Sequence, residues 1–162
     1  MAKIQGGELM AFVMLPKFGE DVSIGFATNH TLEIGSETAD TSNKDEGGGK
    51  WASAEVKQLS WTVTSENFLS FQCAGANFAD LYSIMEQKKL VKLTIDEPAG
   101  GFSDVYGWSP NLYKNIYYGW ACVSSLQLNA QNGEYATFTV TFTGVGRLAT
   151  DGEDLPEPEN HI

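Results

Sequence analysis

Few residues in the sequence have side chains suited to catalysis or to metal binding. The chain has two histidines, His30 and His161, and two cysteines, Cys73 and Cys122. A nucleophilic enzyme needs a base beside its nucleophile, yet His30 falls in an expected strand and His161 is the penultimate residue of an acidic tail. No Gly-x-Ser-x-Gly, His-Glu-x-x-His or Cys-x-x-Cys motif occurs. We therefore expect no enzyme, no catalytic residue, no metal site and no cofactor, and we expect the cysteines to be small buried hydrophobes.

An acidic, glycine-rich stretch over residues 37–50 superficially resembles a calcium loop. Such a loop needs oxygen ligands at positions one, three and five and a glutamate at position twelve. Counted from Asp40, position five is Lys44 and position twelve is Trp51. The spacing therefore predicts an acidic loop without a bound ion.

The charge balance argues against a protein that holds nucleic acid. The chain has 162 residues with 21 Asp plus Glu and 10 Lys plus Arg, for a net charge of -11. Binding to a duplex requires clustered cations, and Lys88-Lys89 is the only adjacent basic pair. A hydrophobic content of 42% predicts a folded core. No apolar stretch is long enough to span a membrane, and the first residues lack the apolar segment of a signal peptide, so we expect cytoplasmic synthesis.

Alternating hydrophobicity predicts a mainly β fold, a β-sandwich or barrel with one flanking α-helix. Strands are expected at about 9–15, 23–34, 56–64, 90–95, 116–128 and 134–144, with 68–73 a weaker candidate. In two of these strands one face is apolar and the other is polar without charge. The polar residues are Gln58, Ser60, Thr62 and Thr64 in the first strand, and Thr137, Thr139, Thr141 and Thr143 in the second.

One segment, residues 77–89, has helical spacing of its apolar residues. Asn77 is suited to cap the first turn and Asp80 to face its positive end, while Lys88 and Lys89 suit the negative end. We expect a single amphipathic helix that packs on the sheet.

The remaining segments divide the chain into one β domain over residues 1–148 and an acidic C-terminal arm over 149–162. Two long loops are expected within the domain, at 36–51 and 97–115. The second lies in an aromatic stretch whose members could stack on sugars or bases, fill a core or line a protein interface. The interface candidates are Tyr106, Trp108 and Tyr113.

The run from residue 27 to residue 69 resembles the major tail tube protein family of tailed bacteriophages. The residues that carry the resemblance are Glu37-Thr38-Ala39-Asp40-Thr41-Ser42-Asn43-Lys44-Asp45, then Gly49-Lys50-Trp51, then Ser60-Trp61-Thr62-Val63-Thr64. The helix and the closing Phe/Thr strand follow in the order typical of that family. The aromatic segment and the acidic arm have no counterpart in the pattern.

The resemblance implies hexameric rings that stack into a hollow tube for genome DNA, with strand edges of neighbouring subunits joined into an inner barrel. It implies a virion tail component, assembled in the host cytoplasm with tape measure, tail-tip and tail terminator proteins. It also implies that the long loop contacts the adjacent ring. The residues expected to make this contact between rings are Glu37, Asp40, Lys44, Asp45, Glu46, Lys50 and Trp51.

A surface along which DNA slides should present no cations, because each Lys or Arg would hold a phosphate. The two polar strand faces, at 58–64 and 137–143, are therefore candidates for the lumen lining. Two alternatives stay open from the sequence. One is the inner tube of a contractile injection machine, and the other is a monomeric β-sandwich that binds a glycan or a host surface through its aromatic segment.

Overall fold

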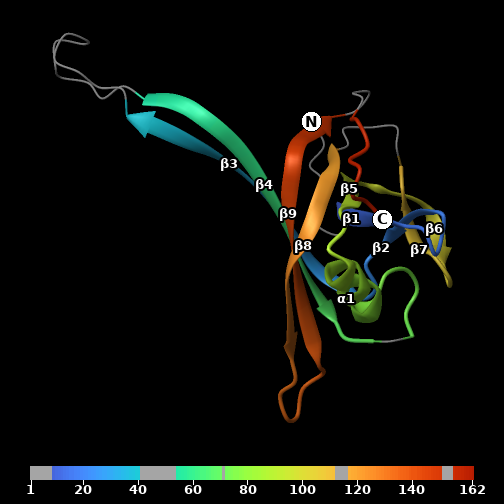
Figure 1. The fold of residues 1–162 in the computed structure, drawn as a ribbon. Coiled ribbons are helices and arrows are strands. Elements are labelled where there is room, and N and C mark those ends of the chain that lie inside the picture. Colours follow the sequence, from blue (N-terminus) through green and yellow to red (C-terminus); the bar gives the residue numbers. More distant parts are fainter. Residues whose placement is uncertain (1–8, 41–53, 71, 112–116, 151–154) are drawn as a thin grey trace, which may run out of the picture.

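The structure, a computed structural model, describes residues 9–40, 54–70, 72–111, 117–150 and 155–162 (Figure 1). Within these ranges, no helix is long and apolar enough to cross a membrane. The chain order of the elements is β1 (Met10–Leu15), β2 (Glu20–Ser23), β3 (Ala27–Asp40), β4 (Ala54–Phe68), α1 (Phe78–Gln87), β5 (Val91–Asp96), β6 (Pro98–Ser103), β7 (Gly107–Pro110), β8 (Tyr117–Asn129) and β9 (Thr137–Thr150).

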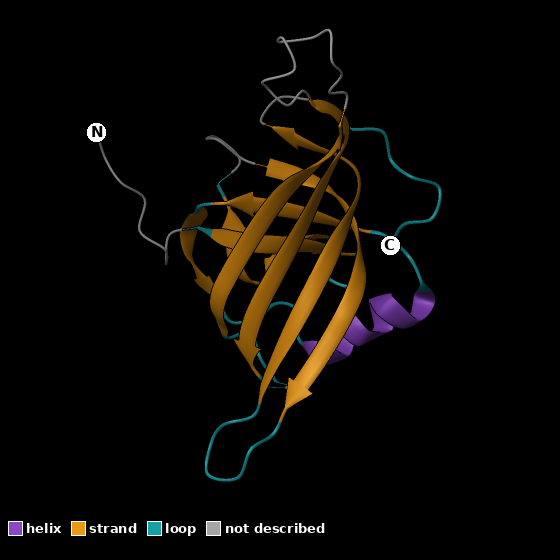
Figure 2. Cartoon of the chain, turned by 90° about the vertical axis from the view of Figure 1, so that its left-hand side faces the viewer, coloured by secondary structure: helices purple, strands orange, loops and turns teal. Residues whose placement is uncertain are grey.

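Seven strands form one antiparallel sheet in the order β2-β1-β5-β8-β9-β4-β3, and β6 and β7 form a separate hairpin. The four long strands β3, β4, β9 and β8 make up the front layer in Figure 2, and shorter strands cross behind them. The expected mainly β fold with one flanking helix is therefore confirmed.

The core lies between the front layer and the elements behind it. Leu32, Val63, Phe142 and Val123 are opposite one another across β3, β4, β9 and β8, so their side chains share the inner face. The helix α1 covers this face with buried Leu81 and Ile84. Apolar burial of this kind is the main stabilising contribution to the fold.

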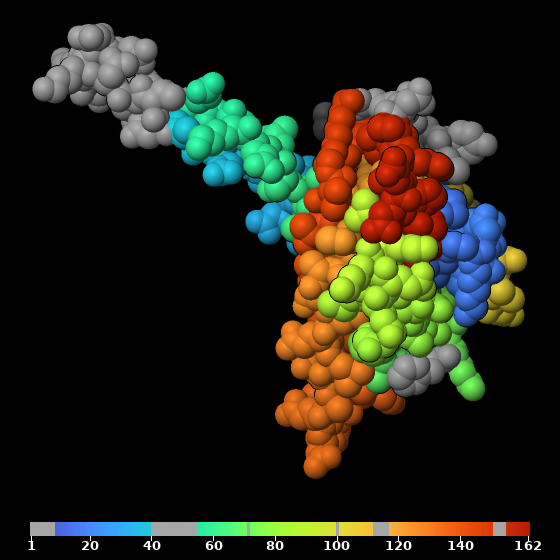
Figure 3. Space-filling model, in the orientation of Figure 1, coloured from blue at the N-terminus to red at the C-terminus, as the bar shows by residue number. Residues whose placement is uncertain are grey.

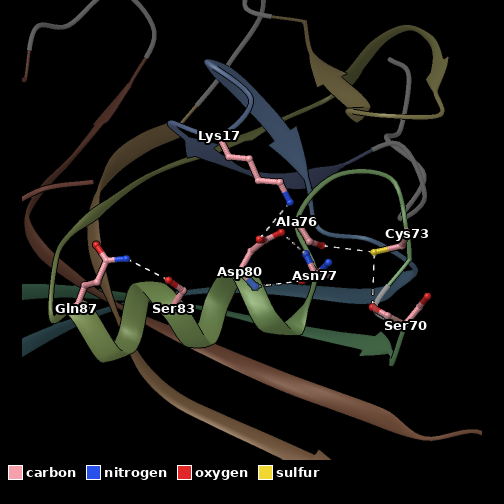
Figure 4. Close-up of polar contacts among 8 residues, drawn as sticks. All are labelled: Lys17, Ser70, Cys73, Ala76, Asn77, Asp80, Ser83 and Gln87. Carbon is pink, nitrogen blue, oxygen red and sulfur yellow. Dashed lines mark hydrogen bonds and ion pairs between the residues drawn. The ribbon is translucent and has the colours of Figure 1, made fainter.

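The helix begins where the sequence predicts, because Asn77 and Asp80 form a capping box (Figure 4). The Asn77 side chain accepts a hydrogen bond from the Asp80 backbone N–H at 3.0 Å, and the Asp80 carboxylate accepts one from the Asn77 N–H at 3.2 Å. The Lys17 ammonium also lies 3.6 Å from Asp80. The helix ends at Gln87 because Lys88 takes a left-handed conformation, so Lys88 and Lys89 follow the last turn instead of occupying it.

Three strand and loop boundaries differ from the sequence prediction. The expected strand 23–34 is broken at Phe26, whose φ of 53° turns the chain between β2 and β3. No strand covers the described residues between Phe68 and Cys73. Residues 36–40, expected in a loop, extend β3, because Ser36 pairs with Leu59 and the ladder continues to the pair of Asp40 and Ala54.

The segment 97–115, expected as a loop, contains the β6–β7 hairpin. Gly107 begins β7 with a φ of 74°, a conformation that favours glycine. The next backbone N–H, of Trp108, donates a hydrogen bond to Ser23 Oγ at 2.9 Å. These two features hold the hairpin beside β2.

The C-terminal segment also differs from the expected arm. The strand β9 continues to Thr150, and the last residues return to the body beside Leu90. The Leu90 N–H donates to Asn160 O at 3.0 Å, and the Ile162 N–H donates to Leu90 O at 2.8 Å. The His161 ring lies 5.1 Å from the Trp120 ring. These contacts order the end of the chain within a single copy.

Candidate functional site

The outer surface of the front layer is a continuous polar face built from all four long strands. Across β3, β4, β9 and β8, one row of paired residues runs from Thr31 through Thr64 and Thr141 to Ser125. The rows on either side of it are aligned in the same way. We call these three rows the polar face. Its members are Asn29, Glu66, Thr139 and Gln127; Thr31, Thr64, Thr141 and Ser125; and Glu33, Thr62, Thr143 and Cys122.

The sequence predicts the two halves of this face, and the structure brings them together. The register pairs Thr62 with Thr143 and Thr64 with Thr141, so both threonine rows lie on one surface. Gln58 and Ser60 continue the same face along β4 toward its start, and Thr137 ends it on β9. All eight predicted lining residues therefore lie on the same side of the sheet.

The electrostatic character of the polar face is acidic and free of cations. Its twelve residues include the carboxylates of Glu33 and Glu66 and no Lys or Arg. Ser124, which lies between the paired rows on β8, connects β8 to β9. Its Oγ donates a hydrogen bond to the backbone O of Thr141 at 3.0 Å and accepts one from Thr143 Oγ1 at 2.8 Å. The face therefore offers neutral dipoles and negative charge to whatever lies against it.

Two strand edges beside the polar face have no strand partner among the described residues. The strand β3 is the last in the sheet, and β5 pairs with β8 only from Tyr117 to Ala121. The edge of β8 from Cys122 to Asn129 is consequently open on the side away from β9. Open edges of this kind are templates for pairing with another chain.

The far half of the β3–β4 hairpin stands away from the body (Figure 3). Glu37, predicted for inter-ring contact, is exposed on this part of β3, and Asp40 ends the strand. The other predicted contact residues lie outside the described residues; they are Lys44, Asp45, Glu46, Lys50 and Trp51.

Two of the predicted interface aromatics, Tyr106 and Trp108, lie in the β6–β7 hairpin, on the opposite side of the molecule from the polar face (Figure 1). Trp108 contacts Phe102 with ring centroids 5.6 Å apart, and Tyr106 contacts Phe18 at the same separation. Tyr106 is exposed and Trp108 is half-buried. Tyr113 lies outside the described residues.

His30 lies on the inner side of β3, paired with Ser65, and lines a pocket of about 480 Å³. Both ring nitrogens are buried and have no hydrogen-bond partner among the described residues. Burial lowers the pKa of the His30 imidazole, because the charged form loses its hydration. The half-buried imidazole of His30 therefore favours its neutral form in the folded chain.

Two other titratable groups are shifted by burial. Burial raises the pKa of the Asp21 carboxyl, with Glu20 adding to the rise and Lys92 opposing it. Burial also raises the pKa of the Cys73 thiol, and Asp80 adds to this effect. Within the described residues, no cluster of His, Cys, Asp or Glu could hold a metal ion, and Cys73 and Cys122 are free and half-buried instead of fully buried.

A sheet with one polar face, a core behind it and, among the described residues, an open edge on each side is suited to be a repeating wall element of an assembly. The family model described as phage tail tube protein matches residues 12–150. The chain belongs to the phage tail tube protein family.

Solved structures share the fold at low sequence identity. The tail of an empty gene transfer agent particle, refined with C6 symmetry, is 15% identical with a TM-score of 0.67, over 91% of this chain and 98% of that chain. The SPP1 tail tube is 10% identical with a TM-score of 0.67, over 93% of this chain and 80% of that chain. A chain of the 6-fold symmetrised baseplate of the anti-feeding prophage is 8% identical with a TM-score of 0.59, over 93% and 95%. No curated protein matches the chain significantly.

Proposed function

We propose that the chain is the major tail tube subunit of a phage, that six copies form a ring, and that stacked rings form the conduit for genome DNA. The polar face lines the lumen of this tube. The observation that carries the proposal is the cation-free surface formed in register by four strands. Family membership and the six-fold symmetry of the similar assemblies support the same function.

A cation-free wall suits the passage of DNA. Duplex DNA carries one negative charge per about 1.7 Å, and every Lys or Arg that neutralises a phosphate adds to binding. At about 0.15 M salt the Debye length is about 8 Å, so Glu33 and Glu66 repel the duplex only near the wall. The surface therefore keeps DNA off the wall without closing the passage.

The open edges supply the joints of the ring. The free edge of β3 in one copy pairs with the free part of β8, Cys122–Asn129, in its neighbour. Such pairing satisfies backbone groups that are otherwise left to water, and it makes the polar faces of adjacent copies continuous.

The remaining contacts follow the same arrangement. Residues 36–51 reach the adjacent ring, and Tyr106, Trp108 and Tyr113 belong to a protein interface on the outer side. The tape measure, tail-tip and tail terminator proteins are the partners along and at the ends of the tube. The subunit has a structural and not a catalytic role in the virion tail, and it assembles in the host cytoplasm.

Electron microscopy of the purified protein at increasing concentration tests the assembly. We expect rings or tubes of constant diameter. Particles that stay monomeric at all concentrations contradict a tube subunit and favour the alternative of a monomeric binding module.

Thiol labelling of assembled tubes tests which face lines the lumen. Cys122 lies on the polar face, so in a Cys73→Ala background we expect it to react with N-ethylmaleimide but not with a bulky polyethylene-glycol maleimide. Subunits separated from the tube should react with both reagents. As a matched control, the exposed Val105 on the outer side is replaced by cysteine in a chain lacking both native thiols, and should react with both reagents in either state. Bulky labelling of Cys122 along intact tubes contradicts the assignment.

A further inference from the structure

The part of the β3–β4 hairpin that leaves the body carries an uncovered apolar face. Ile34, Val56 and Leu59 are 57%, 61% and 70% exposed. Ile34 pairs with buried Trp61, and Leu59 lies two residues before Trp61 on the same side of β4. A register shift after Glu37 brings Val56 onto this side as well. The inner, core-facing side of the sheet therefore continues past the core, where no described residue of the same copy covers it.

A second uncovered apolar surface lies at the other end of β4. Phe26, Phe68 and Tyr135 are 59%, 44% and 86% exposed and line a pocket of about 340 Å³ together with Leu69. The Phe68 and Tyr135 rings are in contact, with centroids 6.1 Å apart. Exposed aromatic patches of this kind mark interaction sites.

Two backbone hydrogen bonds connect the segments that line this pocket. Phe26 O accepts a hydrogen bond from the Phe68 N–H at 3.1 Å, and Ala136 O accepts one from the Leu69 N–H at 2.9 Å. The φ of 53° at Phe26 is strained for a bulky residue, and it sets the ring between this pocket and a neighbouring apolar pocket. Strain that keeps an aromatic ring exposed is typical of a binding surface and not of a core.

We propose that the pocket of Phe26, Phe68 and Tyr135 receives the apolar face of the β3–β4 hairpin from a copy in the adjacent ring. This inference rests on the proposed tube function and names the receiving surface for ring stacking. Val56 and Phe68 stand near opposite ends of β4, roughly 40 Å apart at about 3.3 Å per residue. A head-to-tail repeat along the tube therefore brings the two surfaces toward each other in successive copies, and such heterologous contacts propagate without limit.

A second copy explains both surfaces at once. Each apolar surface is exposed in a single chain and each finds a complementary apolar partner in the next one, which removes both from water. With its core-facing side covered in this way, the hairpin still presents Ser60 and Gln58 on the side of the polar face. The polar lining then continues from one ring to the next without an apolar gap.

Disulfide cross-linking in tubes tests the contact. The chain carries Leu59→Cys and Tyr135→Cys in a background of Cys73→Ala and Cys122→Ser, and mild oxidation follows assembly. Because both substituted side chains are largely exposed, we expect normal folding. Contact between rings links copies along the tube, so denaturing gels should show a ladder that extends well beyond six subunits.

The same gel separates the possible outcomes. A ladder that stops at six places the contact within one ring and overturns the proposal, and so does the absence of cross-links in well-formed tubes. The matched control replaces Tyr135→Cys by Val105→Cys, on the outer β6–β7 hairpin, and should give no ladder. Failure of the unsubstituted chain to form tubes contradicts the proposed function itself, which distinguishes the two failures.

Mixing two blocked variants gives an independent test. Leu59→Asp removes the inserting surface and Tyr135→Asp removes the receiving surface, and each alone should yield single rings and lose tube elongation. A mixture of preformed rings should yield pairs of rings, because each variant retains the surface that the other lacks. Tyr82→Asp, on the exposed side of α1, is the matched control and should elongate normally. Unpaired rings in the mixture, or tubes from either variant alone, overturn the proposal.

Discussion

The indole of Trp61 in β4 lies directly on the backbone of Gly144 in β9, in the space that a Cβ at position 144 would occupy. The same ring lies against Gly119 in β8, where a Cβ would stand 2.7 Å from Cζ2. Trp61 Nε1 donates a hydrogen bond to Gly146 O at 3.1 Å. One side chain therefore fixes the spacing of three of the four strands that form the polar face.

Gly144→Ala should destabilise the fold by about 1–3 kcal/mol, the range for overpacking a filled site. The added methyl group meets the indole of Trp61, so either the ring or the strands must shift. Urea unfolding followed by tryptophan fluorescence measures the change in the free energy of unfolding. Gly101→Ala is the control, because a Cβ there meets nothing within 4 Å. Equal stabilities of the two variants would show that Trp61 moves aside freely.

The neutral His30 predicts a loss of stability in mild acid. Burial lowers its pKa in the folded state below the usual value of 6.5, so the unfolded chain binds the proton more readily. The contribution of the neutral imidazole to the free energy of unfolding is fully present above pH 6.5. It is lost as the pH falls from there toward the lowered pKa of the folded state. The slope due to this single group cannot exceed about 1.4 kcal/mol per pH unit. Unfolding curves measured between pH 5 and pH 7.5 should show that the free energy of unfolding decreases as the pH is lowered.

His30→Leu isolates this contribution from the other titrating groups. The Asp21 carboxyl, whose pKa burial raises, has the opposite sign, because its protonation favours the folded state as the pH falls. Subtracting the variant profile from that of the unsubstituted chain removes Asp21 and leaves His30. A difference that is flat from pH 7.5 to pH 5 would contradict the burial of a neutral imidazole.

The sequence predicts which side of each strand is polar, but it does not predict which strands lie next to one another in the sheet. Alternation of Phe and Thr in β9 is a local property, and it places Thr141 on the polar side without knowledge of the fold. The pairing of Thr141 with Thr64 joins segments far apart in the chain, so no local pattern predicts that the two rows form one surface. The role of Gly144 is equally invisible, because it depends on the indole of a residue in another strand.

The receiving pocket was missed for a similar reason. Phe26 interrupts an otherwise regular strand pattern, and a bulky residue gives no signal of a left-handed backbone. The docking of the C-terminus was missed because its acidic composition predicts an arm, whereas Ile162 packs against the core. In contrast, the cap of α1 was predictable, since Asn77 and Asp80 act on backbone groups within one turn.

Asn77→Ala should lower the free energy of unfolding by about 1 kcal/mol, because it leaves the first turn of α1 without its capping acceptor. The Asp80 carboxylate keeps its own hydrogen bond, because it accepts from the backbone N–H of residue 77, so the variant removes only the side-chain half of the box. Ser83→Ala, in the middle of the same helix, is the matched control; it removes only an exposed contact with Gln87 and adds a stronger helix former. Thermal unfolding followed by circular dichroism compares the two. A smaller effect at 77 than at 83 would contradict the capping geometry.

Thr141→Lys should leave tube assembly intact and slow the release of DNA from phage particles several-fold at low salt. Thr141 lies in the central row of the polar face, so every ring gains six ammonium groups on its lining if six copies form it. Each contact with phosphate displaces counterions, and raising the salt concentration should therefore restore the rate. Release is followed by the fluorescence of a DNA-binding dye after the particles are triggered. Thr141→Gln separates charge from size, and Val105→Lys places the same charge on the outer side. Release as slow in either control, or a slow rate that salt does not relieve, would show that the polar face does not meet the DNA.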